Sequence, residues 1–409
     1  MPDDSNFFDR STPSPPVGKS RAKLKVVPAG PLVLQPAVLP KPGDIPPRPW
    51  LYGTQLIRGF VTVLVAPGGT GKSAYAMAVA AAIASGVPFL GQHIFACGPT
   101  AVLNLEDPME ELDRRVAAIM MRHKLERYQL EDRFYLHSGE NRPITIAAHG
   151  SDGFTVVYPD EDAIITQINE HHIVLLVVDP YAESHSLEEN SNPDMVKAAA
   201  AWRRIARATD CAILLVHHVR KGAVTDIDAA RGAKALTDSA RVGLILSPMS
   251  GDEAEEFGIG EADRWAYVRL DDAKVNLAPK AAKARWMRLE QVELGNATKE
   301  YPSGDKVAAI AQWAPPDAVA HLTNSQLNEV LDVIAEPPAG WLYSAHRRGR
   351  DNQRWAGQAL VSLGMSEKQA QHLIGEWLKS GLLYPETYRD DEQRKMRTGV
   401  RVDHSRRPS

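Results

Sequence analysis

An octapeptide with three glycines constrains this chain more than any other stretch. It reads Ala66-Pro67-Gly68-Gly69-Thr70-Gly71-Lys72-Ser73 and follows directly on the apolar run from Phe60 to Val65. A helix is expected from Ser73 to Ser85, immediately behind it. A strand, a glycine turn and a helix N-terminus in this order aim backbone N–H groups and the positive end of the helix dipole at one point. The sequence therefore predicts an α/β fold with an anion site at this turn.

The residue types in the octapeptide indicate a nucleoside triphosphate. The backbone from Pro67 to Gly71 is expected to surround the phosphates, while Lys72 supplies charge to the β and γ phosphates and Ser73 a hydroxyl for Mg²⁺. Ala66 stands where the usual pattern has its first glycine, and a residue facing a strand end tolerates a methyl group. The predicted nucleotide-binding residues are Pro67, Gly68, Gly69, Thr70, Gly71, Lys72 and Ser73.

Composition narrows the class of protein. The 409 residues carry a net charge of −4, so no global basic field indicates nucleic acid, and any such contact must be local. The two cysteines, Cys97 and Cys211, are too few for a disulfide scaffold or a zinc cluster. No apolar run is long enough to span a bilayer, and the N-terminus lacks a signal-peptide core. We expect a cytoplasmic protein without membrane contact.

The chain divides into four predicted parts. Residues 1–49 hold twelve prolines and are expected to form a flexible arm, either a plain leader or a docking segment. Residues 50–295 alternate short apolar runs with helical stretches, which predicts an α/β domain with a mainly parallel, helix-flanked sheet. Residues 296–322 are expected to be a linker, and residues 323–409 a small helical module with a basic tail. Helices followed by a charged hairpin-like segment resemble a winged helix.

The expected elements of the α/β domain follow from hydrophobic periodicity. The strands are Val61–Ala66, Thr100–Leu105, Phe134–His137, Ile173–Val178, Ala212–Val216 and Val242–Leu246, with a hairpin-like pair at Ala266–Leu270 and Ala284–Val292. The helices are Ser73–Ser85, Met109–His123, Asp160–Glu170, Asp194–Thr209 and Arg231–Ser239. The stretch Ile144–Val157 is interpreted as an insertion with a hairpin.

Polar residues follow three of these strands. Asp179 comes after the longest apolar run and is expected to bind Mg²⁺, since the carboxyl ends of parallel strands share one edge. Glu106 is predicted to activate water, and Asp107 to cap the next helix. His217-His218 could contact the γ phosphate or form a core pair; zinc is disfavoured because no third ligand lies at suitable spacing. The basic loop from Val219 to Ala230 either touches an anionic polymer or is a solvated surface.

These motifs together resemble a known family. Glu106-Asp107-Pro108, Asp179-Pro180, His217-His218, Lys221-Gly222 and Arg231-Gly232-Ala233 with Arg241 are similar to RecA-like ATPases of the plasmid RepA type, the hexameric replicative helicases. The resemblance covers roughly Trp50 to Leu289. It implies ATP as the substrate, Mg²⁺ as the cofactor and a homo-oligomeric ring, and it extends to Lys274, Asn276, Ala278-Pro279 and Arg285-Trp286.

The resemblance also implies roles for single residues. His218 corresponds to the γ-phosphate sensor, and Arg241 to the arginine finger that reaches a neighbouring subunit's ATP. Arg231 is the other candidate for the finger, and Arg115 corresponds to an arginine near the nucleotide. Each of these arginines could instead form a surface ion pair.

Three functions remain open from the sequence. The first is a Mg²⁺-dependent ring ATPase that acts on DNA, most simply single-stranded, as a helicase or replication ATPase of a plasmid or phage-type element. The second is a regulatory RecA-like ATPase without unwinding. The third is an initiator protein in which ATP controls DNA binding and turnover is slight. The Pro-rich arm, the C-terminal module and the short loop after His218 depart from minimal family members, so hydrolysis is better supported than translocation.

Overall fold

The structure is a computed structural model that describes residues 34–153, 155–188, 191–219, 236–279, 284–316, 322–338, 340–347, 353–391 and 394–408. The chain separates into two compact units, Met1–Pro47 and Arg48–Ser409. In the first unit, the described residues 34–47 contain a single 3₁₀ turn, η1 (Pro42–Asp44), and all are solvent-exposed. This extended course agrees with the proline content of the predicted arm.

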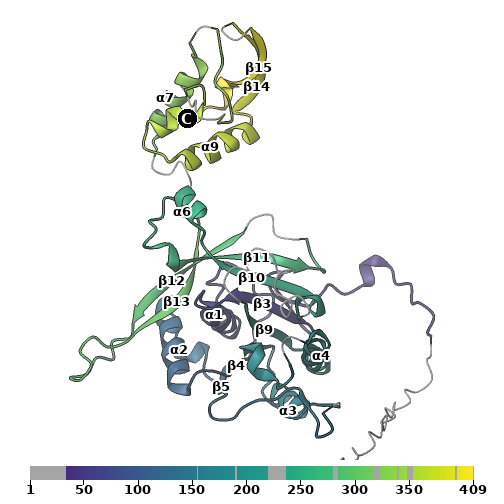
Figure 1. Ribbon diagram of the computed structural model, residues 1–409. Helices are drawn as coiled ribbons and strands as arrows, with labels where there is room; N and C mark the ends of the chain where they lie inside the picture. The colour runs from purple at the N-terminus through teal and green to yellow at the C-terminus, as the bar shows by residue number, and fades with distance from the viewer. Residues whose placement is uncertain are drawn as a thin grey trace, which may run out of the picture. The chain divides into compact units, whose positions relative to one another are not determined.

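Nine strands of the described residues form one sheet (Figure 1), in the order β13-β12-β11-β10-β3-β9-β8-β4-β5. The strands from β10 to β5 in this order run parallel, whereas β11, β12 and β13 are antiparallel to their neighbours. Their bounds are β3 Val61–Pro67, β4 Thr100–Asn104, β5 Phe134–Ser138, β8 Leu175–Asp179, β9 Ala212–Val219, β10 Val242–Pro248, β11 Tyr267–Val275, β12 Arg285–Glu293 and β13 Lys306–Trp313. The predicted α/β fold with a mainly parallel sheet is confirmed.

Helices cover both faces of the sheet (Figure 1). On one face, α1 (Lys72–Ser85) and α2 (Met109–His123) pack on a core that contains Leu64. On the other, α3 (Glu161–Glu170) and α4 (Asn192–Thr209) pack on a core that contains Val63. Because successive residues of β3 are buried on opposite faces, this strand is an uninterrupted apolar run in the sequence. The same burial holds the following glycine turn at a rigid strand end.

The predicted linker at residues 296–322 is wrong. Within it, β13 pairs antiparallel with β12 along its whole length, and Ala309, Ile310 and Ala311 are buried. Prolines and glycines on either side suggested a linker, but the apolar residues between them complete the sheet edge. The α/β domain therefore extends to Trp313.

Smaller elements complete the domain. The insertion contains the expected hairpin, β6 (Ala148–His149) paired with β7 (Val156–Val157). Elements that periodicity did not indicate are the hairpin β1 (Trp50–Tyr52) with β2 (Leu56–Ile57), the helix α6 (Gly251–Phe257), and the 3₁₀ turns η2 (Arg127–Gln129), η3 (Tyr181–Ser184) and η5 (Arg264–Ala266). Of the helix expected at Arg231–Ser239, residues 236–239 are helical and the rest lies outside the described residues.

The C-terminal residues form a cluster of their own. It consists of α7 (Asn324–Ala335), α8 (Gly357–Val361), α9 (Glu367–Ser380) and the hairpin β14 (Leu383–Asp390) with β15 (Lys395–Val402), followed by η6 (His404–Arg406). Trp355, Leu331 and Ile374 are buried in its core. The three helices and the hairpin occur in the expected order, and the winged-helix assignment stays a prediction.

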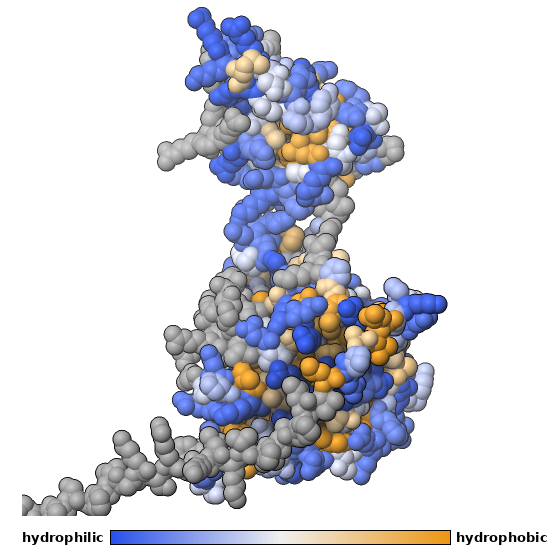
Figure 2. Space-filling model, turned by 90° about the vertical axis from the view of Figure 1, so that its right-hand side faces the viewer, coloured by the Kyte–Doolittle hydropathy of each residue, from blue (hydrophilic) through white to orange (hydrophobic). Residues whose placement is uncertain are grey.

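Helix lengths and surface hydropathy bear on membrane contact. Among the described residues, no helix is long and apolar enough to cross a bilayer. On the face shown in Figure 2, apolar residues lie in separate patches among hydrophilic ones. Scattered apolar residues of this kind are normal for a protein surface.

Candidate nucleotide-binding site

The glycine turn has the geometry of a phosphate-binding loop. Gly69 and Gly71 have φ angles of +77° and +78°. Glycine adopts this left-handed backbone conformation at little energetic cost, because it has no Cβ. The Thr70 hydroxyl donates a hydrogen bond of 2.9 Å to the carbonyl of Pro67, which closes the turn. Gly71 is the N-cap of α1, and no side chain caps this end. The first N–H groups of α1 therefore stay available to an anion.

Ser73 and Asp179 meet across two elements. The Ser73 hydroxyl donates a hydrogen bond to the Asp179 carboxylate, which is 2% exposed and lies at the end of β8. Burial raises the pKa of Asp179, while the Ser73 hydrogen bond and the Lys72 charge oppose that rise. Asp179 Oδ1 has no hydrogen-bond partner among the described residues. A serine hydroxyl and a buried carboxylate oxygen with an open acceptor fit the hard-oxygen coordination of Mg²⁺.

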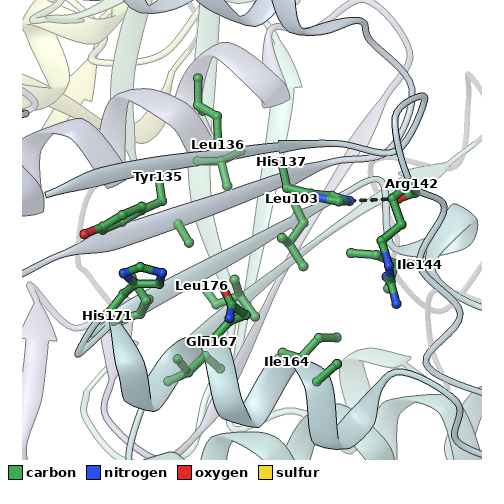
Figure 3. A pocket seen from close by; sticks show the side chains of 15 residues that line it. Leu103, Tyr135, Leu136, His137, Arg142, Ile144, Ile164, Gln167, His171 and Leu176 are labelled. Atoms are coloured by element: carbon green, nitrogen blue, oxygen red, sulfur yellow. Dashed lines mark hydrogen bonds between the residues drawn. The ribbon is translucent and has the colours of Figure 1, made fainter. Parts of the chain in front are cut away.

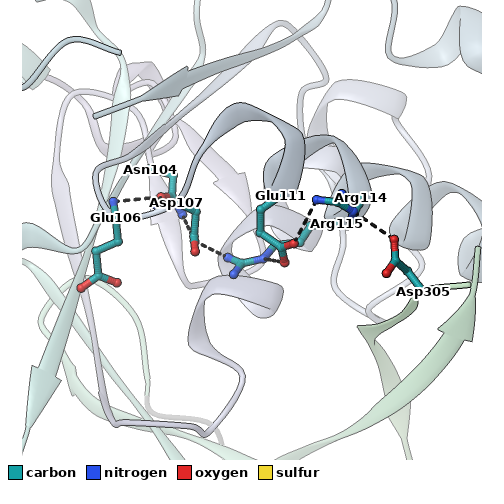
Figure 4. A network of polar contacts seen from close by, with 7 residues as sticks. All are labelled: Asn104, Glu106, Asp107, Glu111, Arg114, Arg115 and Asp305. Atoms are coloured by element: carbon teal, nitrogen blue, oxygen red, sulfur yellow. Dashed lines mark hydrogen bonds and ion pairs between the residues drawn. The ribbon is translucent and has the colours of Figure 1, made fainter. Parts of the chain in front are cut away.

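Lys72 lies within the field of two carboxylates. Its side chain is 5% exposed, and burial lowers its pKa, whereas Asp179 and then Glu106 raise it. Glu106 is solvent-exposed directly behind β4, and its side chain points away from its neighbours Asn104 and Asp107 (Figure 4). The structure therefore brings Lys72, Ser73, Asp179 and Glu106 together at one edge of the sheet.

A polar network orders the turn between β4 and α2 (Figure 4). The Asn104 side chain accepts from the Asp107 backbone N–H at 2.7 Å and donates to Asp107 Oδ2 at 2.9 Å. Arg115 Nη1 lies 2.8 Å from the same Oδ2, and its Nε lies 3.2 Å from Glu111 Oε1. The sequence suggested Asp107 as the cap of α2, and this prediction is wrong. The N-cap is Pro108, and the Asp107 side chain binds Asn104 and Arg115 instead.

The two histidines belong to β9 itself, which extends further than predicted. His218 pairs in register with Ala66, beside the phosphate-binding loop. Burial lowers the pKa of His218, and the Lys72 charge lowers it further, so the ring is neutral near pH 7 and close to Lys72. His217 is buried below Tyr181, with ring centroids 6.1 Å apart, and burial lowers its pKa to about 4. His217 is thus part of the core, whereas His218 lies beside the phosphate-binding loop.

An open polar cleft of about 620 Å³ adjoins the glycine turn. One wall is the turn with the start of α1, the second is α2, and the third is the β12–β13 hairpin. Its lining residues are Gly69, Gly71, Lys72, Ser73, Ala74, Glu111, Arg114, Arg115, Gln291, Asp305, Lys306, Val307 and Ala308. Arg115 lines the cleft and is held by two carboxylates, and its contact with a nucleotide stays a prediction. Sequence reasoning missed Arg114 and the hairpin residues; the apolar run inside Lys306–Trp313 was the signal that could have indicated that strand.

Arg241 lies at the opposite end of the sheet from the glycine turn. Its backbone N–H donates to the carbonyl of Val61, at the start of β3, whereas the turn follows Pro67 at the end of that strand. Six strand residues at about 3.3 Å each separate the two ends by roughly 20 Å. The Arg241 side chain is exposed there. Arg231 and the basic loop after Val219 lie outside the described residues.

A second cavity, of about 400 Å³, lies between β4, β5 and α3 (Figure 3). Its lining is mostly hydrocarbon, including Leu103, Ile164 and Leu176. His137 Nε2 at its rim is 2.8 Å from the carbonyl of Arg142. None of the residues of the glycine turn line it. This cavity lies on the α3 face of the sheet and is separate from the polar cleft.

The fold and the site together define an α/β core with a phosphate-binding loop of the P-loop type. A phosphate-binding loop, a buried aspartate and an exposed glutamate stand at the carboxyl ends of parallel strands, where α/β sheets bind ligands. Residues 35–224 match the family described as "AAA domain". This match covers a little less than half of the chain, from the described residues before β1 to the segment after β9.

Two solved structures are similar in outline. The crystal structure of the RadB recombinase shares 14% identity, with 57% of this chain and 88% of that chain covered and a TM-score of 0.36. A KaiC-like protein from the hyperthermophilic archaeon Pyrococcus horikoshii OT3 shares 15% identity, with 64% and 94% covered and a TM-score of 0.38.

Proposed function

We propose that this chain is a Mg²⁺-dependent ATPase that assembles into a homo-oligomeric, hexameric ring and acts on DNA as a helicase or replication ATPase of a plasmid or phage-type element. The observation that carries the ATPase part is the Ser73–Asp179 hydrogen bond beside Lys72. Phosphate loops occur with many activities, but this pair adds the oxygen ligands that a metal–triphosphate complex needs.

The residues divide the work of hydrolysis. Lys72 neutralises charge on the β and γ phosphates, and Ser73 with Asp179 would hold Mg²⁺, which when bound neutralises further phosphate charge. Glu106 is exposed, so its carboxylate can accept the proton of a water whose oxygen bonds to the γ phosphorus as the bond to the β-phosphate oxygen breaks. His218 is neutral and can form a hydrogen bond with the γ phosphate. Loss of the γ phosphate would break this hydrogen bond and so be felt at the end of β9.

The position of Arg241 supports the ring. An arginine roughly 20 Å along the strand from its own phosphate loop cannot reach its own ATP. Exposed at the other end of the sheet, it is available to a neighbouring subunit, as an arginine finger acting in trans requires. A ring places the end of one subunit's sheet against the next subunit's site.

The C-terminal hairpin supports a DNA contact. Several basic residues of the predicted tail are neutralised, since Arg401 pairs with Glu386, Arg406 with Asp403 and Arg407 with Asp332. At the far end of the hairpin the exposed cations form no ion pair with any described residue, and they are Arg389, Arg394 and Lys395. Exposed cations gathered at one end of a strand pair suit the phosphate backbone of DNA.

ATP hydrolysis and strand displacement on a forked duplex test the proposal together. We expect ATPase activity that DNA stimulates, with Lys72→Ala losing ATP binding and Glu106→Gln keeping it while hydrolysis falls about 10²-fold or more. Displacement should disappear in both variants. Hydrolysis without displacement would favour the regulatory ATPase, and ATP binding with scarcely any hydrolysis on DNA would favour the initiator.

A further inference from the structure

The β12–β13 hairpin packs directly on the phosphate-binding loop. A Cβ placed on Gly71 would lie 2.7 Å from Leu289 Cδ2 of β12, so no space separates the two elements there. Beside this contact, residues of the hairpin and of α2 line the open polar cleft of about 620 Å³. Binding sites for small ligands range over about 300–1,000 Å³, so the cleft is large enough for a nucleoside. The hairpin also lies beyond residue 224, the last residue of the AAA-domain match.

An ion pair bridges the two walls of this cleft. Arg114 Nε on α2 lies 3.1 Å from Oδ2 of Asp305, the residue directly before β13 (Figure 4). The Asn296 side chain donates to the same Oδ2 at 2.7 Å, and its Oδ1 accepts from the Asp305 backbone N–H at 2.8 Å. The Asn296 hydrogen bond, and then Arg114, lowers the pKa of Asp305. Asp305 is therefore ionised near pH 7 and fixed in orientation.

Both members of the ion pair keep a group that can bind a ligand. Among the described residues, both side-chain donors bind Oδ2 of Asp305, which leaves Oδ1 as an acceptor. Arg114 is 42% exposed, and besides Asp305 it has a looser contact of 3.7 Å between its Nη1 and Glu111 Oε2, whereas Arg115 is 24% exposed and held at 2.8 Å by Asp107 and 3.2 Å by Glu111. A planar guanidinium with an open face stacks on nucleobases.

We propose that this cleft binds the nucleoside part of the ATP, with Asp305 accepting a hydrogen bond from a ribose hydroxyl and Arg114 stacking on the base. The inference rests on the proposed function, because the phosphates must lie on Lys72 and Ser73. Asp179, Glu106 and His218 surround the other side of that loop, so the nucleoside extends toward the hairpin. The ribose and base thereby join α2 to β13, and the hairpin becomes part of the nucleotide site.

Two ligands separate the nucleoside contacts from the phosphate contacts. Calorimetric titration with Mg²⁺ and ATP is compared with titration by inorganic triphosphate, which has no base or ribose. We expect Asp305→Asn and Arg114→Ala each to weaken ATP binding about tenfold, since a hydrogen bond to a charged group or a stacked base contributes on this scale. Binding of inorganic triphosphate should change less than twofold. Lys72→Ala should weaken both ligands.

Deoxy analogues of ATP and a control variant test the assignment of Asp305 to the ribose. The wild type should bind ATP more tightly than one of the two analogues 2′-deoxy-ATP and 3′-deoxy-ATP, the one that lacks the hydroxyl bound by Asp305, and this preference should disappear in Asp305→Asn. Lys299→Ala, at the tip of the same hairpin and outside the cleft, is the matched control and should bind ATP like the wild type.

The results separate the two levels of the proposal. Unchanged ATP affinity in both cleft variants would overturn the nucleoside assignment, and so would an equal loss of triphosphate affinity, which would indicate a general disturbance of the loop. A wild type that binds neither ligand would instead overturn the ATPase itself.

Discussion

Replacing Gly71 by alanine tests how the phosphate-binding loop is held. Two costs coincide at this residue: its φ is +78°, and a Cβ would lie 2.7 Å and 2.9 Å from the two Cδ atoms of Leu289. Gly69 has nearly the same φ, +77°, but no atom lies within 4 Å of its Cβ position. The loop thus offers a matched pair of glycines that differ in steric surroundings.

The structure gives a magnitude for each substitution. A left-handed conformation costs an L-residue about 1–2 kcal/mol, so Gly69→Ala should destabilise the α/β domain by that amount. Gly71→Ala should add about 1–3 kcal/mol, because Leu289 is 8% exposed in a packed core and must move to avoid the overlap. We therefore expect Gly71→Ala to cost roughly 2–5 kcal/mol in total.

Leu289→Ala isolates the steric part. By itself this substitution should cost about 2–5 kcal/mol through loss of burial and the cavity it leaves. In its background, Gly71→Ala should cost only the conformational part, about 1–2 kcal/mol. The double-mutant cycle should thus give a coupling of about 1–3 kcal/mol, whereas Gly69 and Leu289 should be additive within about 0.5 kcal/mol.

Hydrogen exchange of the buried α1 amides, recorded at increasing urea concentration, measures these free energies of unfolding for the α/β domain alone. Equal costs for Gly69→Ala and Gly71→Ala, or an additive cycle between Gly71 and Leu289, would refute the claim that β12 packs against the loop. The nucleoside inference would then lose the wall on which it depends.

Three further predictions concern charge, assembly and DNA. Burial lowers the pKa of His217 to about 4, so neutral His217 contributes its full stabilisation above about pH 6.5 and progressively less as the pH falls to 4. Between pH 6.5 and pH 4 the free energy of unfolding of His217→Gln should therefore fall by about 3 kcal/mol less than that of the wild type. Parallel plots of the free energy of unfolding against pH for the two proteins would contradict this. Mixing Arg241→Ala subunits with Lys72→Ala subunits should restore part of the ATPase activity, because some mixed interfaces join an intact phosphate-binding loop to an intact Arg241. If mass measurement shows mixed rings that are nevertheless inactive, Arg241 is not the arginine finger. Neutralising the exposed hairpin cations should lower the salt dependence of single-stranded DNA binding, log Kobs against log[salt], by about 2, at about 0.7 per contact, and an unchanged slope would place the DNA contact elsewhere. The residues to replace are Arg389, Arg394 and Lys395.

The sequence determined the local part of the site. The order of strand, glycine turn and helix at Ala66–Ser73 requires only neighbouring residues, and the φ angles of Gly69 and Gly71 agree with it. Asp179 was assigned from its place behind an apolar run, since parallel strands present their carboxyl ends at one edge. The structure then brings Asp179 to Ser73. Such patterns are legible because the chemistry and the secondary structure share the same short stretch of chain.

Only the tertiary structure decided what each polar side chain binds. Asp107 was expected to cap α2, and Asn104 with Arg115 bind it instead, a choice that depends on how the end of β4 is placed against α2. Residues 296–322 were interpreted as a linker, although β13 is buried at the sheet edge through pairing with β12. Side-chain partners, strand pairing and burial depend on how neighbouring elements are placed in space, so the composition of each segment alone does not state them. For that reason the phosphate-binding loop and Asp179 were predicted, and the Arg114–Asp305 ion pair beside them was not.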